Sequence, residues 1–249
     1  MPRYDFNAPR LYVDAPLAPG QIVAITPAQL NYLVHVLRLK AGDTVLVFNG
    51  QDGEWRATLA SAGKRVLALA IERCMRPQTP ALDLHYLFAP LKHARLDYMA
   101  QKAVEMGASR LQPVITRHAQ VARVNLERLG ANAKEAAEQC GILSLPEIAA
   151  PLSLQRMVAG WDSRRLLVFC DEDAEVTDPI AALEAQRRPA PVPLAVLIGP
   201  EGGFDPSERA ALLALPNVAR LALGPRILRA DTAAVAALAL VGAVLGDWR

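Results

Sequence analysis

The chain has 249 residues, which is enough to bury a sizeable core either as one large domain or as two small ones. Its formal net charge of +2 gives no global field that would demand a polyanionic partner, although a local basic face is compatible with it. Arginine outnumbers lysine by 22 to 5. That excess suits RNA, because guanidinium groups stack on bases and bind phosphates, but from composition alone a codon bias toward arginine and alanine is the simpler explanation.

Cysteine usage and hydropathy favour a soluble protein of a reducing compartment. Cys74, Cys140 and Cys170 are widely spaced, form no Cys-x-x-Cys pair and cannot all pair with one another. The amino terminus lacks the apolar core of a signal peptide. The longest uncharged run, 232–246, has 15 residues and falls short of the ~18 apolar residues expected of a membrane span. We therefore expect a cytoplasmic location.

Short β-like runs dominate residues 1–72. A single helix interrupts them, with Thr26 as its cap, Pro27 at its first position and Leu39 near its end. Turn signals such as Asn49-Gly50 separate neighbouring runs. The sequence therefore predicts a small β-barrel with one helix. The β-like runs are residues 21–25, 44–48, 54–60 and 65–71.

Residues 73–81 contain two prolines among polar residues and are predicted to be a linker. From residue 82 onward strands alternate with helices, which is typical of a parallel sheet covered on both faces. We therefore predict a second, α/β domain over residues 82–249. Its expected strands include 82–88, 111–115 and 166–170, and its expected helices include 95–106, 125–139 and 179–186.

The most informative stretch of the chain lies between residues 194 and 231. An apolar run at 194–198 breaks into a glycine-rich loop, which is followed by a helix predicted to begin at Pro206. A second apolar run, at 218–223, breaks into another loop that contains glycine and proline. Two such breaks predict adjacent loops at the carboxyl edge of the sheet, where α/β proteins bind ligands. Neither loop has Rossmann or Walker A spacing, so a site for a phosphate chain is not supported.

Both loops carry motifs of a known family. Leu197-Ile198-Gly199-Pro200-Glu201-Gly202-Gly203-Phe204 and Leu223-Gly224-Pro225-Arg226-Ile227-Leu228-Arg229 resemble the SPOUT-class methyltransferases, and within that class the ribosomal RNA small-subunit methyltransferase E family. The resemblance implies a C-terminal trefoil knot, S-adenosylmethionine as methyl donor, and a homodimer that methylates N3 of one uridine in 16S ribosomal RNA of the small subunit. It also implies that residues 1–72 form a PUA-like RNA-binding domain, because Pro9-Arg10-Leu11-Tyr12 and His35-Val36-Leu37-Arg38 match its motifs.

The resemblance assigns expected roles to particular residues. Arg229 is the expected catalytic group, because a cation at the mouth of the second loop can stabilise charge on uracil oxygens. Glu201 can act on the base or order its loop, and Asp231 can take part in the chemistry or cap the final helix through Thr232. The expected RNA contacts are Arg10, Arg38, Lys92 and Arg226, with ordinary surface roles as the alternative. The expected cofactor contacts are Leu197, Ile198, Gly199, Pro200, Gly202, Gly203, Leu223, Gly224, Ile227, Leu228 and Thr232.

Several points stay open at the level of sequence. The family usually has an arginine shortly after its Glu-Gln pair where this chain has Ile142 and Leu143, and a glutamate where it has Asp231. No cluster of metal ligands is evident, so we expect no metal. The small residues of the final helix, 232–245, permit either a homodimer seam or burial within the domain. Alternative functions are methylation of another RNA position, or a non-catalytic role in RNA binding or assembly.

Overall fold

The computed structural model describes residues 8–62, 65–121, 123–175 and 178–248, and it divides into two compact units. Unit 1 comprises Met1–Pro80 and Ala137–Ser144, and unit 2 comprises Ala81–Ala136 and Leu145–Arg249. The segment Ala137–Ser144 had been placed in the C-terminal domain on sequence grounds. Among the described helices, none combines the length and the apolar character that crossing a membrane would need.

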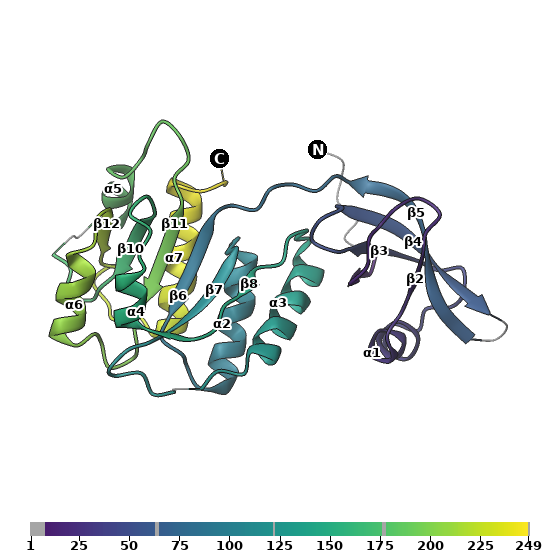
Figure 1. Ribbon diagram of the computed structural model, residues 1–249, viewed down its shortest axis with the longest axis horizontal. Coiled ribbons are helices and arrows are strands. Elements are labelled where there is room, and N and C mark those ends of the chain that lie inside the picture. Colours follow the sequence, from purple (N-terminus) through teal and green to yellow (C-terminus); the bar gives the residue numbers. More distant parts are fainter. Residues whose placement is uncertain (1–7, 63–64, 122, 176–177, 249) are drawn as a thin grey trace. The chain divides into compact units, whose positions relative to one another are not determined.

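Unit 1 is built on one curled sheet of five strands (Figure 1). The strand order is β1-β3-β4-β5-β2, in which β1 and β3 are parallel and the other neighbours are antiparallel. Alternate residues such as Val45 and Val47 face a buried apolar core, as period-2 alternation requires. The predicted β-rich domain is therefore confirmed. The strands are β1 (Arg10–Tyr12), β2 (Ile22–Ala24), β3 (Thr44–Phe48), β4 (Glu54–Ala62) and β5 (Arg65–Arg76).

The helix of unit 1 begins at Pro27, as predicted, but the helical segment ends earlier than the sequence predicted. Thr26 caps α1 (Pro27–Leu30) in a capping box with Gln29, and the chain continues as the π-helix η1 (Asn31–Val36). Arg38 then adopts φ +58°, and the N–H of Leu39 donates to the Leu33 carbonyl over 2.9 Å. This left-handed residue ends the helical segment before Leu39, where the sequence had predicted its end.

The predicted linker is wrong over its first four residues, because β5 continues through Arg76. Arg76 is opposite Glu54 in the β4–β5 ladder, and its guanidinium Nε lies 2.8 Å from a carboxylate oxygen of Glu54. The Glu54 side chain is buried, whereas that of Arg76 is partly exposed. The ion pair between them keeps the last residues of β5 within the sheet. Strand propensity alone gave no signal for it, since residues 72–76 are mostly polar.

Unit 2 is a parallel sheet with the main order β12-β10-β11-β6-β7-β8, and β9 pairs with β7. The predicted α/β fold with a parallel sheet is therefore confirmed. β11 is buried along its whole length, and β10 and β6 are each buried at all but one residue, which explains their continuous apolar runs. The strands are β6 (Leu84–Phe88), β7 (Arg110–Ile115), β8 (Glu147–Ile148), β9 (Leu152–Ser153), β10 (Leu166–Cys170), β11 (Leu194–Ile198) and β12 (Val218–Leu221).

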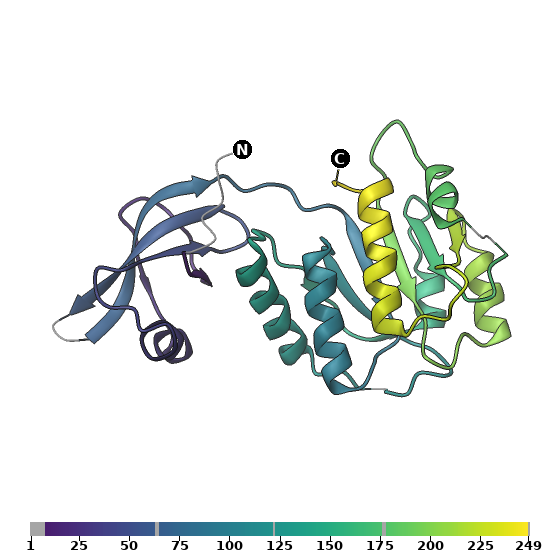
Figure 2. The ribbon, with the colours of Figure 1, turned by 180° about the vertical axis from the view of Figure 1, so that it is seen from behind.

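Helices cover both faces of this sheet. Figure 2 shows α2, α3 and α7 in front of the sheet, and α4 and α6 contact each other on the opposite face. The long helices and most strands match the predicted segments, whereas β1, β8, β9 and α4 were not predicted. The helices are α2 (His93–Glu105), α3 (Leu126–Cys140), α4 (Leu154–Ala159), α5 (Pro179–Glu184), α6 (Pro206–Leu213) and α7 (Ala230–Val244).

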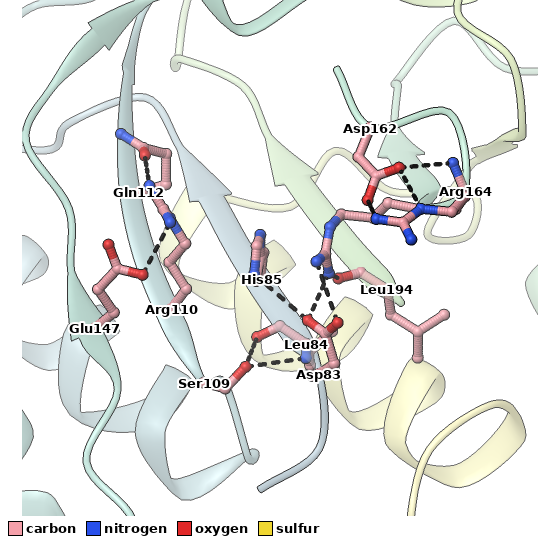
Figure 3. A network of polar contacts seen from close by, with 11 residues as sticks. Asp83, Leu84, His85, Ser109, Arg110, Gln112, Glu147, Asp162, Arg164 and Leu194 are labelled. Atoms are coloured by element: carbon pink, nitrogen blue, oxygen red, sulfur yellow. Dashed lines mark hydrogen bonds and ion pairs between the residues drawn. The ribbon is translucent and has the colours of Figure 1, made fainter. Parts of the chain in front are cut away.

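A polar network joins the amino ends of several strands of unit 2 (Figure 3). Arg165 pairs with Asp83 over 2.7 Å and also donates to the Leu194 carbonyl over 2.9 Å, which links β6, β10 and β11. His85 lies 3.4 Å from the same Asp83 carboxylate. Burial, reinforced by the Arg165 guanidinium and opposed by Asp83, lowers the pKa of His85 to about 4. The amino edge is thus held by structural contacts.

Candidate functional site

A cavity of about 580 Å³ opens at the carboxyl ends of β10, β11 and β12. Parallel strands bring the loops that follow them to one edge, so three loops distant in sequence meet there. The sequence predicted that the loops after β11 and β12 would lie together at this edge, but it did not predict that the loop after β10 would join them. The walls consist of Cys170, Asp171, Glu172, Ile198, Gly199, Pro200, Glu201, Gly202, Gly203, Leu221, Ala222, Leu223, Gly224, Pro225, Arg226, Ile227, Leu228, Arg229, Ala230 and Ala233.

Most of the predicted cofactor residues line this cavity. Two of them lie elsewhere: Leu197 has no exposed surface and packs in the core, and Thr232 is exposed in the first turn of α7 but lines no part of the cavity. Leu197 faces away because alternate residues of a strand point to opposite sides of the sheet. The predicted residues that do line the cavity are Ile198, Gly199, Pro200, Gly202, Gly203, Leu223, Gly224, Ile227 and Leu228.

Two glycines of the loop after β11 are required by its geometry. A Cβ on Gly199 would enter the ring of Phe204, reaching 2.9 Å from Cζ and 3.0 Å from Cδ2. Gly203 has φ +70°, and a Cβ there would lie 2.6 Å from a carboxylate oxygen of Glu172. The backbone of this loop therefore forms part of the cavity wall without intervening side chains, and it can approach a ligand closely.

The same loop is anchored where it enters α6. Asp205 caps the helix and forms a capping box with Glu208. The Glu208 carboxylate is buried and also accepts from the backbone N–H of Arg117 over 2.8 Å. His118 Nδ1 lies 3.1 Å from the Gly203 carbonyl oxygen. These contacts hold the loop from behind, so its position is set before any ligand binds.

The loop after β10 contributes an acidic wall that the sequence analysis missed. Asp171 is 2% exposed and lies 3.1 Å from Arg209 and 2.8 Å from Arg220. Arg209 also contacts Asp173 over 2.7 Å, and Glu172 faces the cavity. Three consecutive acidic residues after a buried strand were the available signal. Carboxylates in the wall favour a ligand that carries positive charge.

Cys170 ends β10 at the floor of the cavity. Burial, with a smaller effect of the neighbouring Asp171 carboxylate, raises the pKa of the Cys170 thiol to about 12. A thiol with so high a pKa stays protonated near neutral pH and is a poor nucleophile. It therefore contributes apolar surface to the site rather than covalent chemistry.

The three predicted catalytic residues lie at the mouth of the cavity or beside it. Arg229 is exposed, lines the cavity and occupies the N-cap position of α7 without capping it by its side chain. Glu201 pairs with Arg95 on α2 and accepts from Gln120 Nε2 over 3.2 Å. Asp231 accepts from the Thr232 N–H over 3.0 Å, so it binds the first turn of α7 as expected of a residue near a helix start.

The structure gives the four predicted RNA contacts different surroundings. Arg226 is exposed at the rim of the cavity, Lys92 is exposed just before α2, and Arg38 is exposed after η1. Arg10 requires a correction. Its side chain is 2% exposed, lies 2.6 Å from the Glu54 carboxylate and donates to the Ile142 carbonyl over 3.0 Å.

Arg10 is therefore a structural residue of unit 1. Its guanidinium also donates to the carbonyl oxygens of Ala137 and Glu138, which fixes the segment Ala137–Ser144 within that unit. Ile142 thus supplies a backbone acceptor to a buried cation. A phosphate would have to displace these partners to reach Arg10.

Two family models match the chain. Residues 77–242 match an RNA methyltransferase domain, and residues 25–72 match an RNA methyltransferase PUA domain. The first match covers nearly all of unit 2, and the second covers the part of unit 1 that runs from the start of α1 to within β5.

Curated relatives and solved structures agree with these matches. The ribosomal RNA small subunit methyltransferase E of Rickettsia conorii is 30% identical and aligns over 93% of this chain and 94% of its own. The protein of the same name from Synechocystis is 32% identical over 92% of this chain and 77% of its own. A methyltransferase of Legionella pneumophila, solved with bound S-adenosylmethionine, is 27% identical with a TM-score of 0.85, covering 97% of this chain and 99% of its own.

Proposed function

Because the chain belongs to the ribosomal RNA small subunit methyltransferase E family, we propose that it methylates N3 of a specific uridine in 16S ribosomal RNA. Membership makes it an S-adenosylmethionine-dependent RNA methyltransferase. The observation that carries the finer assignment is the cavity at the carboxyl ends of β10, β11 and β12, which combines a bare glycine backbone, acidic groups and two exposed arginines at its rim.

The residues of the cavity fit S-adenosylmethionine. Its volume of about 580 Å³ lies within the ~300–1,000 Å³ typical of small-molecule sites. Ile198, Leu223 and Leu228 give apolar walls, and the adjoining backbone groups can read the adenine edge. Glu172 and Glu201 favour the sulfonium cation over neutral analogues. When bound, S-adenosylmethionine supplies an electrophilic methyl group.

The chain's own residues have to present a nucleophilic nitrogen. Uracil N3 carries a proton and becomes nucleophilic only when that proton is removed. Removal of the proton places negative charge on N3 and on the two carbonyl oxygens of the base. We assign Arg229 to stabilise that charge, because it is exposed at the cavity mouth with no ion pair among the described residues. Glu201 is assigned to accept the proton, and Asp231 to hold the first turn of α7 beneath Arg229.

RNA binding is assigned to both units. Unit 1 supplies Arg38, whose exposed side chain follows a π-helix, a type of element often found at functional sites. Unit 2 supplies Lys92 and Arg226, which are exposed beside the cavities. The proposed partner is the small ribosomal subunit, and the proposed location is therefore the cytoplasm. We retain the domain assignment of an RNA-binding domain followed by a SPOUT methyltransferase domain with a C-terminal knot.

We also propose a homodimer that uses α7. One face of this helix is buried within unit 2 through residues such as Leu238 and Val241. Val235, Ala236 and Leu240 on its other side are only partly buried, although they are apolar. A second copy that covers this face would bury them. Sedimentation should then give twice the mass of one chain, and Leu240→Glu should give a monomer that keeps its helical content.

The function is tested by methyl transfer from labelled S-adenosylmethionine to small subunits isolated from a strain that lacks this protein. The expected product is one methyl group per subunit, recovered as 3-methyluridine after digestion to nucleosides. Arg229→Ala should lower the rate at least ~10-fold, whereas Arg188→Ala, at an exposed position outside the cavities, should keep it. Label recovered on a ribose or on another base would contradict the assignment to uracil N3.

A further inference from the structure

A second, smaller cavity adjoins the first. Its volume is about 280 Å³, and Pro200 and Glu201 line both cavities. The remaining walls come from the segment before α2 and its first turn, with Leu91, Lys92 and Arg95, and from Gln120. The volume lies just below the ~300–1,000 Å³ of sites that bind drug-sized ligands, so the cavity suits one planar base rather than a second cofactor.

The Glu201 carboxylate lies in the wall that the two cavities share, and two side chains donate hydrogen bonds to it. Arg95 Nη1 donates to one oxygen of Glu201, and Gln120 Nε2 donates to the other over 3.2 Å. Arg95 Nε also lies 4.0 Å from the Asp231 carboxylate. Arg95, which the sequence analysis did not single out, therefore connects α2 to the loop after β11 and to the first turn of α7. Its side chain is 38% exposed, so it can also meet a ligand that enters from solvent.

Two cationic side chains that line the second cavity have donors available to a ligand. Arg95 Nη2 and the ammonium group of Lys92 have no hydrogen-bond partner among the residues that the structure describes. The walls of the second cavity thus hold cationic donors together with a carboxylate acceptor. The Watson–Crick edge of uracil has complementary groups, namely two carbonyl oxygens that accept and an N3–H group that donates. Cytosine would instead direct an amino group at a cation, which has no acceptor to offer.

We infer that the second cavity is the subsite for an unpaired uracil base, which Arg95 contacts at a carbonyl oxygen while Glu201, at the border of the two cavities, lies beside N3 and leaves the path from N3 to the cofactor open. The inference rests on the proposed function and adds the place where the base binds. When N3–H transfers its proton to the Glu201 carboxylate, the negative charge spreads to the base oxygens beside Arg95. The base has to leave its stack to reach this cavity, as in other enzymes that modify bases.

The kinetic test compares three variants on subunits that lack the methyl group. Arg95→Gln should lower the methyl-transfer rate about 10- to 100-fold at pH 7, less than the 10²–10³-fold of a buried oxyanion donor because Arg95 is partly exposed. The difference in rate between Arg95→Gln and the wild-type protein should shrink as pH rises, because N3 then loses its proton to solvent without assistance from the protein. Arg95→Lys should recover part of the rate. Arg128→Gln removes a comparable ion pair, with Asp97, outside both cavities and should have no effect.

S-adenosylmethionine affinity, measured by calorimetry, distinguishes the subsite from an extension of the cofactor cavity. Arg95→Gln should leave it within about twofold. A tenfold loss would assign the second cavity to the cofactor and overturn the inference. A pH-independent deficit would also overturn it, because a purely structural role for Arg95 predicts the same loss at every pH.

A direct binding measurement separates this inference from the proposed function. In the protein loaded with S-adenosylhomocysteine, the ¹⁹F signal of 5-fluorouridine monophosphate at millimolar concentration should broaden and shift, and Arg95→Gln should abolish the effect. If subunits accept no methyl group but the nucleotide still binds through Arg95, the proposed function fails and the subsite stands. If subunits are methylated but the nucleotide binds equally to both proteins, or to neither, the subsite is overturned.

Discussion

The substitution Gly199→Ala tests how the loop after β11 shapes the cofactor cavity. The added methyl would enter the ring of Phe204, at 2.9 and 3.0 Å from two of its atoms. Phe204 is 5% exposed and packs edge-on against Phe169, with ring centroids 5.1 Å apart, so the ring has no free space into which to retreat. Overpacking of this kind costs about 1–3 kcal/mol, which corresponds to roughly 2–12 °C in Tm for a chain of this size.

The loop would also move, and Gly199 lines the cavity. We therefore expect S-adenosylmethionine affinity to fall about tenfold or more, equivalent to ~1.4 kcal/mol. Thermal unfolding and calorimetry measure the two effects. The matched control is Gly130→Ala inside α3, where the methyl would meet only a side-chain atom of Ile148 at 3.7 Å. It should stabilise the helix by ~0.5–1 kcal/mol. Unchanged stability and affinity in Gly199→Ala would refute the steric argument.

Three further predictions concern titration and burial. Because the pKa of His85 is lowered from 6.5 to about 4, the unfolded chain gains a proton in that interval that the folded chain lacks. Unfolding free energy should therefore fall by roughly 1–2 kcal/mol as pH drops from 6.5 to 4, discounted for partial exposure, and His85→Gln should remove this decline in urea titrations. Arg10→Ala removes one of the two guanidinium partners of the buried Glu54 carboxylate and the donor to three backbone carbonyls, and should cost ~3–5 kcal/mol, whereas the exposed Arg164→Ala should change stability little. Cys170, with a thiol pKa of about 12, should resist maleimide at pH 7.5 while exposed Cys74 reacts, and equal labelling by mass spectrometry would contradict the raised pKa.

Strand and helix patterns were sufficient to predict most of unit 2. The runs at 166–170 and 194–198 are long, apolar and bounded by turn residues, and they match β10 and β11 in both bounds. The start of α6 at Pro206 followed from its capping box. The two-residue strands β8 and β9 gave no signal, because so few residues establish no period. The knot implied by the resemblance stays a prediction.

The parts of the site that were missed depend on contacts between distant segments. Asp171 lies at the site because β10, which it follows, pairs with both β11 and β12. This pairing cannot be deduced from the sequence patterns of the three strands. Arg95 reached Glu201 only because α2 and the loop after β11 meet at one edge of the sheet. Arg10 matched an RNA-binding motif, yet its partners are a carboxylate 44 residues away and carbonyls more than 120 residues away. Burial reversed its predicted role.

The measurement that tests the central claim most directly is primer extension on 16S ribosomal RNA from cells with and without this protein. A methyl group on uracil N3 blocks Watson–Crick pairing and stops the polymerase. The account predicts a stop at one uridine that disappears in the deletion strain and returns with the wild-type chain but not with Arg229→Ala. A stop that persists in the deletion strain would contradict it.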